Sequence, residues 1–141
     1  MITLKDYWMG RDVKHGQALG PDTRRNAART VELIDALLNR ARAAGVECQI
    51  SPVTGSVLTS GWRPPAINAA TPGAAPNSKH ITGQAADVYD PQGDLDEWLS
   101  GPTGMAALDD IGLWLEHPAS TKGWSHLQTV PPNSGRRVFY P

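Results

Sequence analysis

The stretch SKHITGQAADVYDP, residues 78–91, joins a polar turn to a mainly apolar strand. We predict the strand over Gln84–Tyr89, because apolar and β-forming residues dominate it and Asp90-Pro91 ends it. Asp87 places a carboxylate on this strand, and a buried carboxylate needs a partner. A metal ion shared with His80, in the turn, is one such partner. The alternative is an outward-facing Asp87, because side chains alternate between the two faces of a strand.

A second histidine on a predicted strand completes a set of metal ligands. The sequence WSHLQT predicts a strand over Trp124–Thr129 with His126 inside it. Two histidines and one carboxylate leave an open position on the metal, as in catalytic zinc sites and in the non-haem iron triad. Calcium and magnesium prefer oxygen ligands, and the single cysteine, Cys48, cannot complete a closed structural zinc site. We therefore expect His80, Asp87 and His126 to hold one metal ion, either zinc or non-haem iron.

Three further side chains are candidates for chemistry beside this metal. Glu116 ends a predicted strand, Leu113–Glu116, and can act as general base if that strand neighbours the one with the second histidine. An exposed glutamate at a strand end is the alternative. His117 follows it and could stabilise an oxyanion. Arg63 lies on a proline-fixed loop, SGWRPP, and suits bidentate binding of a carboxylate; the alternative is a surface arginine stacked on Trp62.

A long amphipathic helix is the strongest signal before residue 50. Its apolar stripe repeats at helical spacing and consists of Val31, Ile34, Leu38 and Ala41. Asp22 or Thr23 can cap its start and Gly45 can end it. Residues 1–20 predict a short helix or an irregular arm.

The elements after residue 50 are short and mixed. Besides the strands above, we predict a strand over Ser56–Ser60 and a loop over 65–79. Two helical segments are predicted over 95–100 and 104–112. This order predicts one α+β domain over residues 1–141, with a small, mostly antiparallel sheet of about four strands. Residues 1–50 would be its helical part and residues 56–130 its catalytic core.

Charge and composition exclude several classes of partner. Thirteen basic and 14 acidic residues give a net charge of −1, so no basic field attracts nucleic acid or an anionic membrane. No apolar run approaches the ~18 residues that cross a bilayer, and the start of the chain has no secretory apolar region. We expect synthesis in the cytoplasm, no membrane insertion and a monomer.

Three blocks of sequence together resemble a known family. The blocks are Ser78, His80, Gly83, Ala85 and Asp87, then Trp124 and His126, and upstream Ser60, Gly61, Trp62 and Arg63. In this order and spacing they resemble the zinc D-Ala-D-Ala carboxypeptidase and L-alanyl-D-glutamate endolysin family of peptidoglycan peptidases. That family shares its fold with the signalling domain of hedgehog proteins. The resemblance covers about residues 56–130.

The resemblance implies a function and a role for each motif residue. The function is hydrolysis of a peptide bond in the stem peptide or cross-link of peptidoglycan. The implied zinc ligands are His80, Asp87 and His126; the implied substrate-binding residues are Arg63, Ser78 and Trp124; and the expected catalytic residues are Glu116 and His117. The absent secretory signal and the compact chain resemble a phage or prophage lysin or a virion-associated hydrolase, which acts on the wall after release or within the particle.

One departure from the family leaves a second function open. Several members place the general base three residues before the last ligand, where this chain has Gly123. Other members place a glutamate at the end of the preceding strand, as Glu116 would be. The alternative function is a non-catalytic, zinc-stabilised binding module of the hedgehog type. An iron(II) oxygenase is disfavoured by the six-residue gap between His80 and Asp87 and by the small number of strands.

Overall fold

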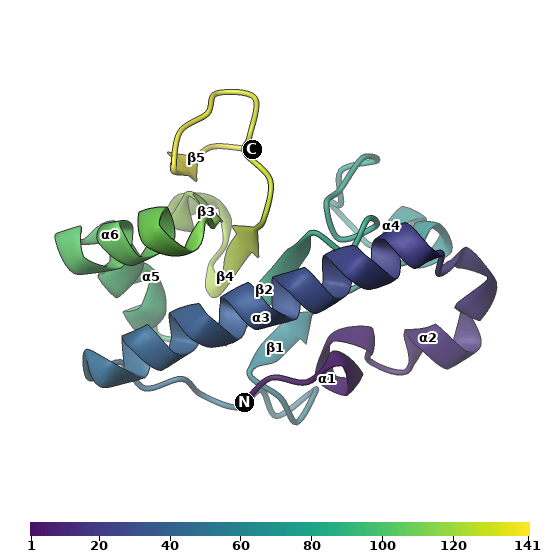
Figure 1. Cartoon of the computed structure of the whole chain (residues 1–141), viewed down its shortest axis with the longest axis horizontal. Coiled ribbons are helices and arrows are strands. Elements are labelled where there is room, and N and C mark those ends of the chain that lie inside the picture. The colour runs from purple at the N-terminus through teal and green to yellow at the C-terminus, as the bar shows by residue number, and fades with distance from the viewer.

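Helix α3, Pro21–Ala43, runs along the molecule and forms one layer of the fold (Figure 1). Its buried side chains recur at helical spacing and are Ala27, Thr30, Ile34, Leu37, Leu38 and Ala41, which confirms most of the predicted stripe. The predicted cap was wrong, because Gly20 is the N-cap and Pro21 opens the first turn. A proline suits the first helical position, because a backbone N–H there has no partner within the helix and proline has no N–H. Gly45 follows the last turn with a φ of +88°, as predicted for the end of the helix.

This computed structural model describes all 141 residues. The other helical elements are α1 Leu4–Trp8, α2 Arg11–Lys14, η1 Gly16–Ala18, α4 Pro65–Ala70, α5 Asp94–Ser100, α6 Pro102–Ile111 and η2 Pro118–Ser120. The strands are β1 Leu58–Ser60, β2 Ala85–Asp90, β3 Trp114–Glu116, β4 Gly123–Gln128 and β5 Val138–Phe139. None of the helices is long and apolar enough to cross a membrane.

The strands form one mixed sheet in the order β1-β2-β4-β3-β5. All pairings are antiparallel except that of β3 with β5. The α+β class and the four predicted strands are confirmed, with ends that differ by one or two residues. The sequence did not predict β5, whose two residues are too few to show an alternating pattern. The predicted loop over 65–79 was wrong in its first part, where α4 begins at Pro65.

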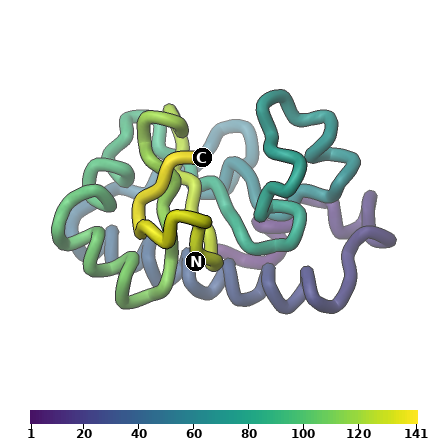
Figure 2. Tube along the Cα trace, turned by 90° about the horizontal axis from the view of Figure 1, so that it is seen from above, coloured from purple at the N-terminus to yellow at the C-terminus, as the bar shows by residue number.

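The two faces of the sheet differ in character. Ala86, Val88, Leu115 and Leu127 point to one side and join the hydrophobic core with residues of α3. In Figure 2 this helix lies along one side of the molecule, while the connection after α4 and the one between β3 and β4 rise on the opposite side. Because side chains alternate, the neighbours of the core residues on β2 and β4, including Asp87 and His126, point away from α3.

The N-terminal arm closes the β1 end of the sheet. Tyr7 is fully buried, and its hydroxyl donates to the carbonyl of Ala85 over 2.7 Å. Its own carbonyl accepts from the backbone N–H of Trp62 over 3.1 Å. A Cβ on Gly61 would collide with this carbonyl, so only glycine allows the arm to approach so closely. The arm, residues 1–20, therefore packs directly against the segment that follows β1.

Candidate metal centre

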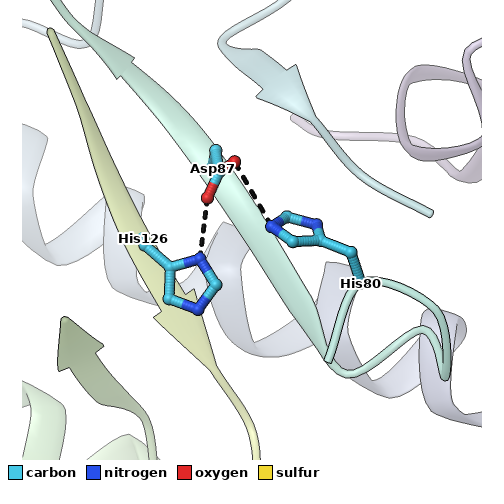
Figure 3. Close-up of side chains that lie close together, drawn as sticks. All are labelled: His80, Asp87 and His126. Atoms are coloured by element: carbon cyan, nitrogen blue, oxygen red, sulfur yellow. Dashed lines mark hydrogen bonds and ion pairs between the residues drawn. The ribbon is translucent and has the colours of Figure 1, made fainter. Parts of the chain in front are cut away.

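Two histidines converge on one carboxylate at the middle of the sheet. Asp87 on β2 lies opposite His126 on β4 in the strand register, and His80 reaches them from the turn before β2 (Figure 3). Asp87 Oδ2 is 3.2 Å from His80 Nε2, and Asp87 Oδ1 is 2.8 Å from His126 Nδ1. The candidate ligand atoms of the three residues all lie within 4.8 Å of one another. This group could hold a metal ion, and Asp87, at 8% exposure, does not point into solvent as the alternative required.

The turn that carries His80 is fixed on α3. The hydroxyl of Ser78 accepts the backbone N–H of His80 over 3.3 Å. Gly83 has a φ of +76°, and a Cβ there would lie 2.8 Å from the carbonyl of Thr23. Thr30 donates from its hydroxyl to the carbonyl of Gly83 over 2.7 Å. The local structure thus explains why serine and glycine occupy these two motif positions. Ser78 contacts the turn that carries His80, and its predicted role in substrate binding stays a prediction.

The imidazole of His80 is oriented for metal binding. Its Nδ1 lies 2.7 Å from the carbonyl oxygen of Gly61, which can only accept, so Nδ1 donates. Nε2, which faces Asp87, is then the nitrogen that is left to bind a metal. A hydrogen bond from the second ring nitrogen to a carbonyl is the usual support of a metal-ligating histidine. The nitrogen and oxygen donors of the cluster could therefore hold a metal ion.

Electrostatics couple the charges of the cluster. Burial alone would raise the pKa of Asp87, but His80 and His126 outweigh burial and hold that pKa well below its usual range. Burial alone would lower the pKa of His126, but the hydrogen bond and charge of Asp87 raise it above its ordinary value. Asp87 is therefore ionised at neutral pH, as a metal-ligating carboxylate must be.

Glu116 lies in line with the cluster. Strand β3 pairs with β4 through Leu115 and Leu127, and the next step of this antiparallel register places Glu116 opposite His126. Asp87, His126 and Glu116 thus form one row across three adjacent strands. Burial raises the pKa of the half-buried Glu116, His126 lowers it and Asp87 raises it. The condition set by the sequence, that the two strands be neighbours, is met.

Arg63 lies at the other side of the cluster and is buried, with 9% of its surface exposed. Its Nη2 is 3.9 Å from Asp87 Oδ2, and its Nη1 donates to Asn68 Oδ1 over 3.2 Å. The surface arginine stacked on Trp62 is therefore not what the structure contains. Trp62 is itself fully buried, packs edge-on against Trp8 with ring centroids 5.9 Å apart, and donates from its indole to a backbone carbonyl.

Two predicted site residues make no hydrogen bond to the cluster. His117 accepts the backbone N–H of Ala119 at its Nδ1 over 3.0 Å, and its ring stacks on Tyr140 with centroids 4.3 Å apart. These contacts do not bring His117 to the cluster, and its predicted role at an oxyanion stays a prediction. Trp124 is 36% exposed on β4, and it shares a sheet face with His126. This placement leaves its indole open to a ligand.

Sequence reasoning missed the supporting role of three residues, of which only Gly61 was named, as a motif position. Asn68 holds the guanidinium of Arg63, Gly61 offers its carbonyl to His80, and Gln128 contacts His126. Gln128 could have been found, because residues two apart on a strand share a face. Nothing in the sequence indicated a role for Asn68, because it lies in a stretch that was predicted to be a loop.

No protein-family model matches the chain, and no relative is found among curated proteins or solved structures. The resemblance to zinc peptidases therefore rests on the motif residues, and the hedgehog-like fold stays a prediction.

Proposed function

We propose that this protein is a zinc metallopeptidase that hydrolyses a peptide bond in the stem peptide or cross-link of peptidoglycan. The observation that carries the proposal is the row of Asp87, His126 and Glu116 on three adjacent strands. In this row the carboxylate of Glu116, which is not one of the three candidate ligands, lies beside a group that could hold a metal ion. Arg63 adds a buried cation at the other side of this group.

The donor atoms favour zinc among the biological cations. His80 would bind through Nε2, His126 through Nδ1 and Asp87 through a carboxylate oxygen, since these atoms face one another. Three protein ligands with one open position are typical of catalytic zinc. A zinc ion there would lower the pKa of a coordinated water to about 7 and polarise the carbonyl that is attacked.

The chain's own residues would supply proton transfer and orientation. Glu116 would accept a proton from the attacking water at a carboxylate oxygen and return it to the nitrogen of the leaving amine. Its position beside His126, on the neighbouring strand, suits this task. Arg63 would bind a carboxylate of the substrate, which stem peptides carry on D-alanine and on γ-linked D-glutamate.

A non-catalytic module with structural zinc is the second candidate function. It is motivated by Gly123, which stands where several members of the resembled family have their general base. Glu116 weakens this candidate, because a binding module has no need of a half-buried carboxylate in line with the ligands. The two functions differ in whether the purified protein turns over peptidoglycan.

Digestion of purified muropeptides with the zinc-loaded protein, followed by mass spectrometry, tests the proposal. The wild type should release fragments whose masses identify the bond that is cut. Glu116→Gln should retain zinc and fold but lower kcat by roughly 10²–10⁴-fold, the usual contribution of a positioned acid–base group. Glu32→Gln, which changes an exposed glutamate on α3, is the matched control. A zinc-loaded wild type without turnover would favour the binding module, and a fully active Glu116→Gln would assign the base elsewhere.

A further inference from the structure

Gln128 is a buried amide beside the ligand His126. It ends β4 two residues after His126, shares its sheet face, and is only 5% exposed. Its side-chain oxygen, Oε1, lies 3.2 Å from His126 Nε2. Its side-chain nitrogen, Nε2, donates to the backbone carbonyl of Val130 over 2.8 Å. Both ends of the amide are therefore engaged.

The carbonyl of Val130 fixes the direction of this amide. A carbonyl oxygen can only accept, so the NH₂ group of Gln128 must face Val130 and Oε1 must face the imidazole. Because Oε1 is also only an acceptor, His126 Nε2 must carry a proton. Nδ1 lies 2.8 Å from Asp87 Oδ1 and donates to this ionised carboxylate. A metal ion bound there would replace the Nδ1 proton, so Nδ1 is the nitrogen left for ligation.

In the two histidines of the cluster, opposite ring nitrogens thus donate to groups outside the cluster. His80 donates from Nδ1 to the carbonyl of Gly61 and presents Nε2. His126 donates from Nε2 and presents Nδ1, and its direction traces back to the carbonyl of Val130 through the amide of Gln128. The remaining nitrogen of each ring faces Asp87. One backbone carbonyl acts directly, and the other acts through a side chain that can be mutated.

We propose that Gln128 is a positioning residue that makes Nδ1 of His126 its metal-binding atom. The proposal rests on the metal centre of the proposed function and names one residue on which the centre depends. Without an acceptor at position 128, the imidazole is free to rotate or to place its proton on Nδ1. Loss of such a supporting contact typically weakens metal binding by 10–100-fold.

Two substitutions separate this role from the contact with Val130. Gln128→Leu removes both hydrogen bonds, whereas Gln128→Glu keeps an acceptor for His126 and loses the donor to Val130. Gln84→Leu is the matched control, because Gln84 lies just before β2 and its side-chain oxygen accepts from Thr82 rather than from a ligand.

Three measurements are made on the purified full-length proteins. Competition with a chelator gives the zinc dissociation constant, proton–nitrogen NMR identifies the protonated nitrogen of His126, and urea unfolding of the metal-free proteins reports stability. We expect zinc binding to be about 10–100-fold weaker in Gln128→Leu, unchanged in Gln84→Leu, and at least as tight as wild type in Gln128→Glu. The zinc-loaded wild type should show its His126 proton on Nε2. Both Gln128 variants should lose stability when metal-free, because each loses the hydrogen bond to Val130.

Three results would overturn the inference. If the leucine and glutamate variants weaken zinc binding equally, Gln128 acts only by tying down Val130. If Gln128→Leu binds zinc within twofold of wild type, the positioning role fails while the metal centre stands. If the wild type binds no zinc, the proposed metal centre and the role of Gln128 fail together.

Discussion

Replacing Arg63 with alanine separates substrate recognition from chemistry. A guanidinium has five N–H donors, and the bond from Nη1 to Asn68 is the only one that a protein group accepts. The nearest carboxylate oxygen, on Asp87, is 3.9 Å from Nη2, beyond hydrogen-bond distance. A buried cation with open donors beside the cluster is suited to an incoming carboxylate.

The size of the effect follows from the burial of this group. Loss of a buried, charged hydrogen-bond partner costs about 2–4 kcal/mol. At about 1.4 kcal/mol for each factor of ten, Arg63→Ala should lower kcat/KM by ~30–1000-fold. Arg63→Lys should restore little, since an ammonium is a point charge without the two parallel donors. Zinc affinity should stay the same or rise, because the substitution removes a positive charge near Asp87.

A comparison of two substrates provides the assay. One is a stem peptide with a free carboxylate near the cut bond, and the other carries the corresponding amide. Amidation should lower kcat/KM strongly in the wild type and hardly at all in Arg63→Ala, whereas Arg40→Ala, which changes an exposed arginine of α3, should behave as wild type. Equal amidation penalties in wild type and Arg63→Ala would refute recognition by Arg63 and leave it only a packing role.

Three other predictions concern the metal, a buried acid and the ligand turn. Purified wild type should contain about one zinc per chain, and His80→Ala, Asp87→Ala and His126→Ala should each lose most of it by elemental analysis. Burial raises the pKa of Asp96 to about 6, so the folded protein retains a proton that the unfolded chain releases above pH ~4. The free energy of unfolding should therefore fall as the pH rises from ~4 to ~6. In urea titrations, Asp96→Asn should remove up to ~3 kcal/mol of that fall. Gly83→Ala should lower the free energy of unfolding by ~2–4 kcal/mol, because its φ of +76° disfavours a Cβ and Thr23 obstructs one.

Much of the candidate site could be predicted because it follows strand periodicity. Asp87 and His126 lie on strands with clear apolar neighbours, and alternation alone gives each a defined face. The position of Glu116 required one further condition, the pairing of β3 with β4, which the sequence could state but not establish. The pairing depends on how the β3–β4 connection folds, and that is a tertiary property.

The parts that could not be predicted depend on contacts between distant segments. Strand β5 exists because Val138 and Phe139 pair with β3, not because of their own pattern. Helix α4 has only six residues and lies in a stretch whose composition favours loops. Strand β1 also shifts its register against β2 between Leu58 and Ser60, and no sequence rule predicts where such an irregularity falls. This shift lies just before the segment that carries Arg63.

The motif Ser-Gly-Trp-Arg shows how fold and site are joined in this protein. Gly61 lets the N-terminal arm approach at Tyr7, and its carbonyl sets the tautomer of His80. Trp62 packs on the arm through Trp8, and the backbone N–H of Arg63 donates to the carbonyl of His80 over 3.1 Å. The arm thus supports the same three residues that orient one ligand and present the guanidinium. Loss of its packing should therefore disturb metal binding and substrate recognition together, although the arm supplies no ligand itself.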